Sequence, residues 1–368
     1  MLRKHITKTP TLFKNKREQA RKAGSAQTAR ACLLFLIRNI KMSELCTTQE
    51  LLEETSIRRL VIRLGVPAMF GQFFNILYNI VDRIFVGRIP GTGEISLASI
   101  GVCAPALTAV TAFAFMVGIG GSSYMSINLG QRNQHRAQEV IGNAFLMLLV
   151  ISVFVTAILL RNREQILYLL GCSKAMYPYA ETYFIIYICG SLAALCGSGL
   201  NQFILAQGFA RQGMLAVVIG AVANVILDPL LIFACGMGIA GAAWGTVFSQ
   251  CCTFAYVIWF LRGKQPVVRL RVSMFWWGIV QKILAIGSMS FLITILDNLI
   301  IILLNTSLRR YGGDVQGDIL ITCATVVQSF ITITACPAQG ITTGCGTIFI
   351  VNDKINFTQS YKEILIAH

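Results

Sequence analysis

The sequence predicts an all-α polytopic membrane protein, on the evidence of its composition and of its long apolar runs. Of the 368 residues, 55% are hydrophobic and 13% are charged, and the mean hydropathy is +0.67. Soluble globular domains carry roughly 25% charged residues, so this class is excluded. The apolar runs reach the roughly 20 residues that a helix needs to cross a bilayer.

Eight stretches have the length and apolar character of a transmembrane helix. We place them at residues 60–87, 97–128, 138–160, 177–206, 213–234, 239–261, 275–304 and 317–350. The first and the fifth spans therefore cross the membrane in the same direction.

Positive charge is concentrated before the first span. Residues 1–63 hold 14 Lys and Arg against 5 Asp and Glu, which is +9 of the net +15. Such a flank favours a cytoplasmic N-terminus, and no basic groove with interleaved aromatic residues indicates nucleic-acid binding. Within this segment, residues 1–41 are either an extension or lie upstream of a true start at Met42.

The basic loop after the sixth span divides the chain into repeats. Gly65 and Gly121 in the first span pair are separated much as Gly287 and Gly344 are in the seventh and eighth spans. We predict a basic N-terminal segment at 1–56, a six-span unit at 57–262, a cytoplasmic linker at 263–274 and an incomplete second unit of two spans at 275–368. Transporters are often built from such repeats.

Two acidic residues lie inside apolar spans, where a charge is expensive and indicates function. Asp82 is five residues before the end of the first span and Asp228 is six before the end of the fifth, so both lie roughly 8 Å inside the same face. Tyr78 and Asn224 each precede one of these acids by four residues and share its helical face. Thr246, on the next antiparallel span, matches Asp228 in depth.

Carboxylate, amide, hydroxyl and phenol oxygens at one depth suit a small hard cation or proton exchange. We therefore predict a cation site at Asp82, Asp228, Asn224, Thr246 and Tyr78, with Na⁺ held by the first four if sodium is the ion. Weaker candidates for lining a substrate cavity are Phe70, Phe73, Phe74 and Asp297.

The sequence shows no pattern typical of a metal site, a disulfide framework or a catalytic site. The 12 cysteines lie mostly in apolar runs without metal-ligand or disulfide spacing, and no nucleophile–base pair occurs in the spans. We expect neither an enzyme nor a bound cofactor, apart from a coupling ion.

Several motifs together resemble the multidrug and toxic compound extrusion (MATE) family, in its bacterial branch similar to the DNA-damage-inducible type. They are GVPAMFGQFFNILYNIVDRIFVGRIPG, NLGQRN, ANVILDPLLI and GIAGAAWGTVFSQ. The resemblance implies two six-helix lobes around a central cavity, of which this chain would hold the N-lobe and the first two helices of the C-lobe. It also implies export of cationic amphipathic drugs across the plasma membrane in exchange for Na⁺ or H⁺, a monomer if the chain is complete, and bending of the first helix at Pro67.

One departure from the family pattern is Leu205, where an arginine is usual, and another is the missing part of the C-lobe. Two rival hypotheses remain. The first is a lipid-linked oligosaccharide flippase of the same superfamily. The second is an inactive truncated remnant or a partner of a complete transporter.

Overall fold

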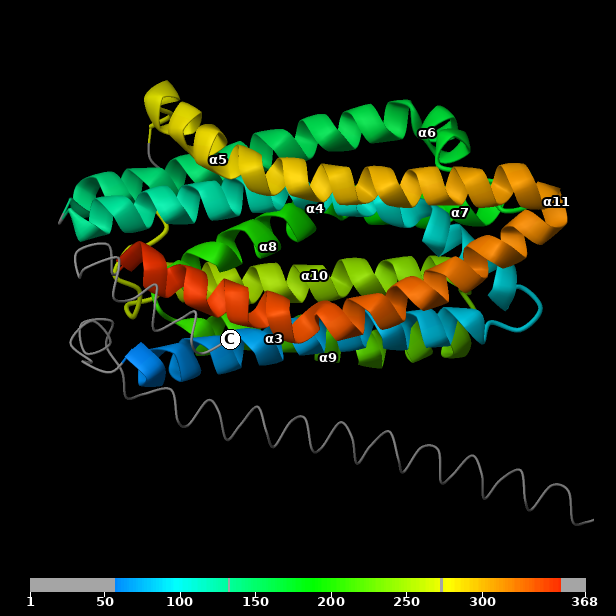
Figure 1. Ribbon diagram of the computed structural model, residues 1–368, viewed down its shortest axis with the longest axis horizontal. Helices are drawn as coiled ribbons and strands as arrows, with labels where there is room; N and C mark the ends of the chain where they lie inside the picture. The colour runs from blue at the N-terminus through cyan, green and yellow to red at the C-terminus, as the bar shows by residue number, and fades with distance from the viewer. Residues whose placement is uncertain (1–56, 132, 272–273, 352–368) are drawn as a thin grey trace, which may run out of the picture. The chain divides into compact units, whose positions relative to one another are not determined.

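The computed structural model of the protein describes residues 57–131, 133–271 and 274–351, and every regular element within these ranges is a helix. The elements, shown in Figure 1, are α3 (Ile57–Gly87), α4 (Gly93–Gly130), α5 (Gln134–Arg161), α6 (Arg163–Leu169), α7 (Tyr177–Cys189), α8 (Ser191–Ala206), α9 (Ala210–Pro229), η1 (Leu230–Ala234), α10 (Ile239–Arg262) and α11 (Trp277–Val351). The predicted N-terminal segment at 1–56 lies outside the described residues.

Most of the predicted spans coincide with helices that can cross a membrane. In the described part of the chain, five helices are long and apolar enough to do so, namely α4, α5, α9 with η1, α10 and the first part of α11 up to Gly313. The bent pair α7–α8 makes a sixth. The first predicted span, α3, and the eighth, in the part of α11 after Gly313, fall outside this set. Helix α3 carries polar residues along one face.

Four irregularities occur within or between the predicted spans. Gly190 separates α7 from α8, which meet at 54°, and the short helix α6 follows α5 directly. After Pro229 the chain widens into the π-helix η1, as expected where proline removes a backbone donor. Gly313, at φ 68°, interrupts α11, and Figure 1 shows the helix turning back there.

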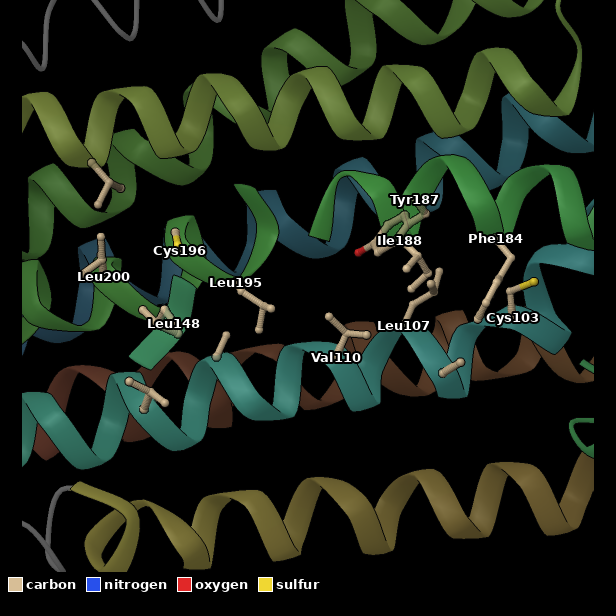
Figure 2. Close-up of a cluster of buried hydrophobic side chains, with 14 of the residues drawn as sticks. Cys103, Leu107, Val110, Leu148, Phe184, Tyr187, Ile188, Leu195, Cys196 and Leu200 are labelled. Carbon is tan, nitrogen blue, oxygen red and sulfur yellow. The ribbon is translucent and has the colours of Figure 1, made fainter. Parts of the chain in front are cut away.

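The core lies where α4, α5, α7 and α8 meet. Figure 2 shows apolar side chains from these four helices in one cluster. They include Cys103, Leu107, Val110, Leu148, Phe184, Ile188, Leu195, Cys196 and Leu200. This cluster fixes the cavity wall that α4, α7 and α8 provide.

Glycines allow α4 to approach its neighbours closely. A Cβ on Gly118 would lie 2.7 Å from the carbonyl oxygen of Gly199 in α8, and one on Gly120 would overlap the carbonyl oxygen of Ile283 in α11. Gly101 likewise faces Thr325 in the second part of α11. Helices in membranes associate through such small residues, so α4 connects both parts of α11 to the rest of the bundle.

The predicted linker at 263–274 is tied to the helices that precede it. Gln207 accepts a hydrogen bond from the backbone of Val268 at 2.9 Å, and Asn143 donates one to the carbonyl oxygen of Met274 at 3.3 Å. The division of the chain into a six-span unit and a second unit remains a prediction.

Candidate functional site: a buried carboxyl pair beside a cavity

Asn224 and Asp228 lie one helical turn apart on α9, and both are fully buried. The amide nitrogen of Asn224 donates a hydrogen bond of 3.0 Å to Oδ1 of Asp228. The spacing of four residues aligns the two side chains, as predicted. Because Pro229 follows and α9 gives way to the π-helix η1, the backbone around Asp228 departs from regular α-helix, as is frequent at functional sites.

Asp82 of α3 lies beside Asp228, so the structure brings together two acids that are 146 residues apart in sequence. The carboxyl groups are close enough for a protonated one to donate a hydrogen bond to the other. Asp82 is 7% exposed and lines a cavity, whereas Asp228 is fully buried behind it. The two acids that the sequence analysis placed at the same membrane depth are therefore neighbours in the structure.

Helix α10 closes the site at Gly245 and Thr246. A Cβ on Gly245 would overlap Oδ1 of Asp228, so the α10 backbone packs directly against the carboxyl group. The hydroxyl of Thr246 donates a 3.0 Å hydrogen bond to the carbonyl oxygen of Ala242 and lines the cavity. Its oxygen lone pairs remain able to accept a hydrogen bond or to coordinate a cation.

The cavity next to Asp82 has a volume of about 350 Å³ and is bounded by α3, α4, α7, α8, α9 and α10. Tyr78 lines it, as predicted, together with Tyr183 and Tyr187 of α7. The hydroxyl of Tyr187 accepts a hydrogen bond of 3.0 Å from Gln250 of α10. Tyrosine rings provide both an apolar face and a polar end, and their faces attract organic cations.

Buried oxygen acceptors without a hydrogen-bond donor gather at this site. Six such oxygens occur in the described part of the chain, and five of them are Oδ1 of Asp82, Oδ1 of Asn224 and Oδ2 of Asp228 at the carboxyl pair, and Oδ1 of Asn201 and Oε1 of Gln250 in the cavity wall. The sixth, the hydroxyl oxygen of Ser96, lies outside the cavity lining. A buried acceptor left unpaired costs about 1–3 kcal/mol. The site is therefore chemically complementary to a cation or to a donor of hydrogen bonds.

Apart from Leu205, the remaining predicted residues lie outside the cavity lining. Phe70 and Phe73 are 40% and 46% exposed, Asp297 is exposed on α11, and Phe74 is half-buried. Pro67 is half-buried inside α3, which continues through it as a helix. Leu205 lines the cavity. The functional roles of all these residues remain predictions.

The sequence analysis gave no role to Gly245 or to Arg83. The guanidinium of Arg83 lines the cavity and donates a 2.9 Å hydrogen bond to the carbonyl oxygen of Thr325 in α11. A signal for the polar face of α3 was present, because Gln72, Asn75, Asn79, Asp82 and Arg83 recur at helical spacing. No local pattern marks Gly245, whose importance depends on the contact between α9 and α10.

A bundle of apolar helices that encloses a polar, acid-lined cavity is typical of multi-pass membrane transporters. Comparison with known proteins indicates which family of this class the chain is similar to. The family model described as MatE matches residues 67–230. The multidrug export protein MepA of Staphylococcus haemolyticus is 27% identical over 263 residues, which are 71% of this chain and 58% of that protein. MepA of Staphylococcus aureus strain NCTC 8325 is 24% identical over the same shares of the two chains.

Solved structures agree with this assignment. The MATE multidrug transporter DinF-BH is 27% identical and superimposes with a TM-score of 0.78 over 85% of this chain and 69% of that one. An outward-facing multidrug resistance MATE family transporter of the MOP superfamily, at 23% identity, shares the fold with a TM-score of 0.75 over 87% of this chain and 71% of that one. The chain is thus similar in sequence and in fold to members of the MATE family. It spans 58% of the length of the curated relatives described above.

Proposed function

We propose that the protein exports cationic, amphipathic small molecules across the plasma membrane in exchange for Na⁺ or H⁺, with its N-terminus in the cytoplasm. The observation that carries the proposal is the contact between the buried carboxyl groups of Asp82 and Asp228 at the wall of a 350 Å³ cavity. Relatives named as multidrug export proteins support the substrate class.

The chemistry of exchange follows from the charges of the two carboxyl groups. Two adjacent buried carboxylates repel each other, and this repulsion is relieved by a bound proton, a metal cation or a cationic substrate. Because Asp82 faces the cavity and Asp228 lies behind it, an ion on the pair and a cationic substrate in the cavity compete for the same negative charge. Binding of one then promotes release of the other.

Either coupling ion fits the donor atoms. Oδ1 of Asp82, Oδ2 of Asp228 and Oδ1 of Asn224 are buried acceptors, and the Thr246 hydroxyl is nearby in α10. Oxygen ligands of this kind suit a hard cation, and the carboxyl pair alone suffices for a proton.

Release to the outside requires α3 to move, and Pro67 is our candidate for the bending point. Proline removes one helical hydrogen bond and weakens the helix at that turn. Two solved relatives, each at 25% identity, are described as MATE in the bent and in the straight conformation. Bending of α3 would shift Asp82 relative to Asp228 and so change the affinity of the pair for its ion.

The test is efflux of a fluorescent cationic dye from cells that produce the full chain. We expect Asp228→Asn to abolish efflux driven by a Na⁺ or proton gradient while the protein remains in the membrane. Glu94→Gln is the matched control, because Glu94 is an exposed acid in the first turn of α4. Undiminished efflux by Asp228→Asn would refute the proposed site. Binding of a pyrophosphate lipid in place of the dye would instead favour a flippase.

A further inference from the structure

Two cationic side chains pack on aromatic rings where α4 ends and where α5 and α11 begin, at the left of Figure 1. The guanidinium carbon of Arg136, in the first turn of α5, lies 5.7 Å from the ring centroid of Trp276. The ammonium nitrogen of Lys282 in α11 lies 5.3 Å from the ring centroid of Tyr124 in α4. Trp276 and Lys282 are six residues apart, about 9 Å along a helix axis. We call these four residues the basic–aromatic cluster.

The two cations of the cluster have no acidic partner in the described part of the chain, where neither Arg136 nor Lys282 takes part in a salt bridge. Nε of Arg136 is buried and has no hydrogen-bond partner among the same residues. Glu139, the acid nearest to Arg136 in sequence, lies 3.5 Å from His135. Residues 262–290 hold no Asp or Glu, whereas their basic residues are Arg262, Lys264, Arg269, Arg271 and Lys282. The cluster is therefore complementary in charge to an anion.

Contacts with α4 and α5 fix both parts of the cluster. The fully buried amide of Asn143 in α5 accepts a 2.8 Å hydrogen bond from the backbone nitrogen of Trp276. Beside Lys282, the carbonyl oxygen of Ile283 lies so close to Gly120 of α4 that a Cβ on this glycine would overlap it. The beginning of α11 is thus held on two other helices. The cluster is preorganised, which lowers the entropic cost of binding a ligand.

Exposed apolar side chains adjoin the cluster and favour a lipid over a free anion as its ligand. Phe275 and Trp277 flank Trp276, and all three are more than half exposed. Tryptophan is enriched at the membrane–water interface. Three apolar residues that follow Lys282 on one face of α11 are also exposed, namely Ile286, Met289 and Ile293. Because α11 is long and apolar enough to cross a membrane here, this apolar stripe leads from the cluster toward the hydrocarbon core.

We propose that the basic–aromatic cluster binds the phosphate of an anionic phospholipid, with Arg136 and Lys282 as the cationic contacts and an acyl chain along the apolar stripe of α11. Basic pockets between transmembrane helices bind anionic headgroups, and a guanidinium suits phosphate oxygens. With the N-terminus in the cytoplasm, as proposed above, the cluster faces the cytoplasmic leaflet, whose anionic lipids attract basic segments. The inference goes beyond the proposed export and does not involve the carboxyl pair.

The test measures quenching of Trp276 fluorescence by brominated lipids. The full chain keeps Trp276 as its sole tryptophan through Trp244→Phe, Trp259→Phe and Trp277→Phe. It is placed in phosphatidylcholine vesicles that contain a minor fraction of phosphatidylglycerol, and bromine is carried by one lipid or by the other. Quenching per mole fraction gives the affinity of phosphatidylglycerol relative to phosphatidylcholine at Trp276. We expect this ratio to be at least about five, the factor that one basic residue near the surface contributes. A ratio of one would overturn the inference.

Charge variants distinguish a defined site from general attraction to a basic surface. Lys282→Gln should lower the ratio about fivefold, and Lys282→Arg, which keeps the charge, should preserve it. Lys264→Gln is the matched control, because it removes the same charge from an exposed residue in the segment after α10, and it should leave the ratio unchanged. Equal losses in Lys282→Gln and Lys264→Gln would mean diffuse attraction and would contradict a defined site.

Excess inorganic phosphate distinguishes a lipid from a free anion. It should not relieve the quenching by brominated phosphatidylglycerol, and relief would assign the cluster to a free anion and reject the lipid. Arg136→Gln, on a different helix, provides a second route to the expected loss where Lys282→Gln does not fold. An unchanged ratio in Arg136→Gln would count against the cluster. None of these measurements depends on dye efflux, so they decide the lipid site separately from the proposed export.

Discussion

Gly245 of α10 and Asp228 of α9 are in such close contact that a single methyl group on Gly245 would overlap the carboxyl oxygen Oδ1. The carboxyl group is therefore positioned by the backbone of a neighbouring helix as well as by its own partner Asn224. Because Asp228 is fully buried, it has little room to move away from an added methyl group.

We predict that Gly245→Ala displaces the Asp228 carboxyl group and weakens cation binding. Overpacking in a well-packed region typically costs about 1–3 kcal/mol, which should appear as a lower midpoint of thermal unfolding in detergent. Gly130→Ala is the control, since no heavy atom lies within 4 Å of the added methyl group there. Equal unfolding midpoints and equal dye efflux for the two variants would contradict the contact.

The hydrogen bond from Asn224 to Asp228 leads to a second prediction. Asn224→Ala removes the donor that faces Oδ1 of Asp228, and a hydrogen bond to a charged group contributes about 1.5–3 kcal/mol. We expect at least about a tenfold higher concentration of Na⁺ or H⁺ for half-maximal dye efflux. Asn162→Ala is the matched control, because that exposed amide bonds only to the backbone of Ile158 among the described residues. An unchanged ion dependence in Asn224→Ala would show that the bond is dispensable.

The sequence predicted those features that depend on the hydropathy of one segment or on the cost of burying one charged residue. Apolar length marked the spans, and the high cost of a carboxylate in hydrocarbon singled out Asp82 and Asp228. The rise per residue of a helix then placed Asp82 and Asp228 at the same depth in the membrane. The fold brings the two residues into contact. These are inferences about single helices, for which the spacing along the sequence is sufficient.

Features that depend on tertiary contacts could not be found in the same way. Phe70 and Phe73 were candidates for the cavity lining, yet the face of α3 that turns inward carries Asn75 and Asp82, while both phenylalanines are exposed. The bend at Gly190 falls inside the run 177–206, which reads as one continuous span, whereas the kink at Gly313 lies in the polar stretch between the seventh and eighth predicted spans. Which face of a helix is covered depends on neighbours that are distant in sequence.

The approach of α11 to α4 gives a prediction about stability. A Cβ on Gly287 would overlap the carbonyl oxygen of Met116, and this backbone atom cannot rotate away as a side chain would. Gly287→Ala should therefore reduce the free energy of unfolding by about 1–3 kcal/mol. Gly278→Ala on the same helix is the control, since its nearest heavy atom lies 3.9 Å from the added methyl group. Unfolding of both variants in urea, followed by circular dichroism, provides the comparison.

The orientation of the chain can be tested at Cys235, which is exposed in the turn between η1 and α10. With the N-terminus in the cytoplasm, this turn follows the fifth span and should face outward. In a variant that keeps Cys235 as its sole cysteine, a membrane-impermeant maleimide should label intact cells. A cysteine-free protein with Lys264→Cys, in the segment after α10, is the matched control and should be labelled only after the cells are opened. The reverse pattern would invert the proposed topology, and with it the side from which Asp82 and Asp228 would receive their ion.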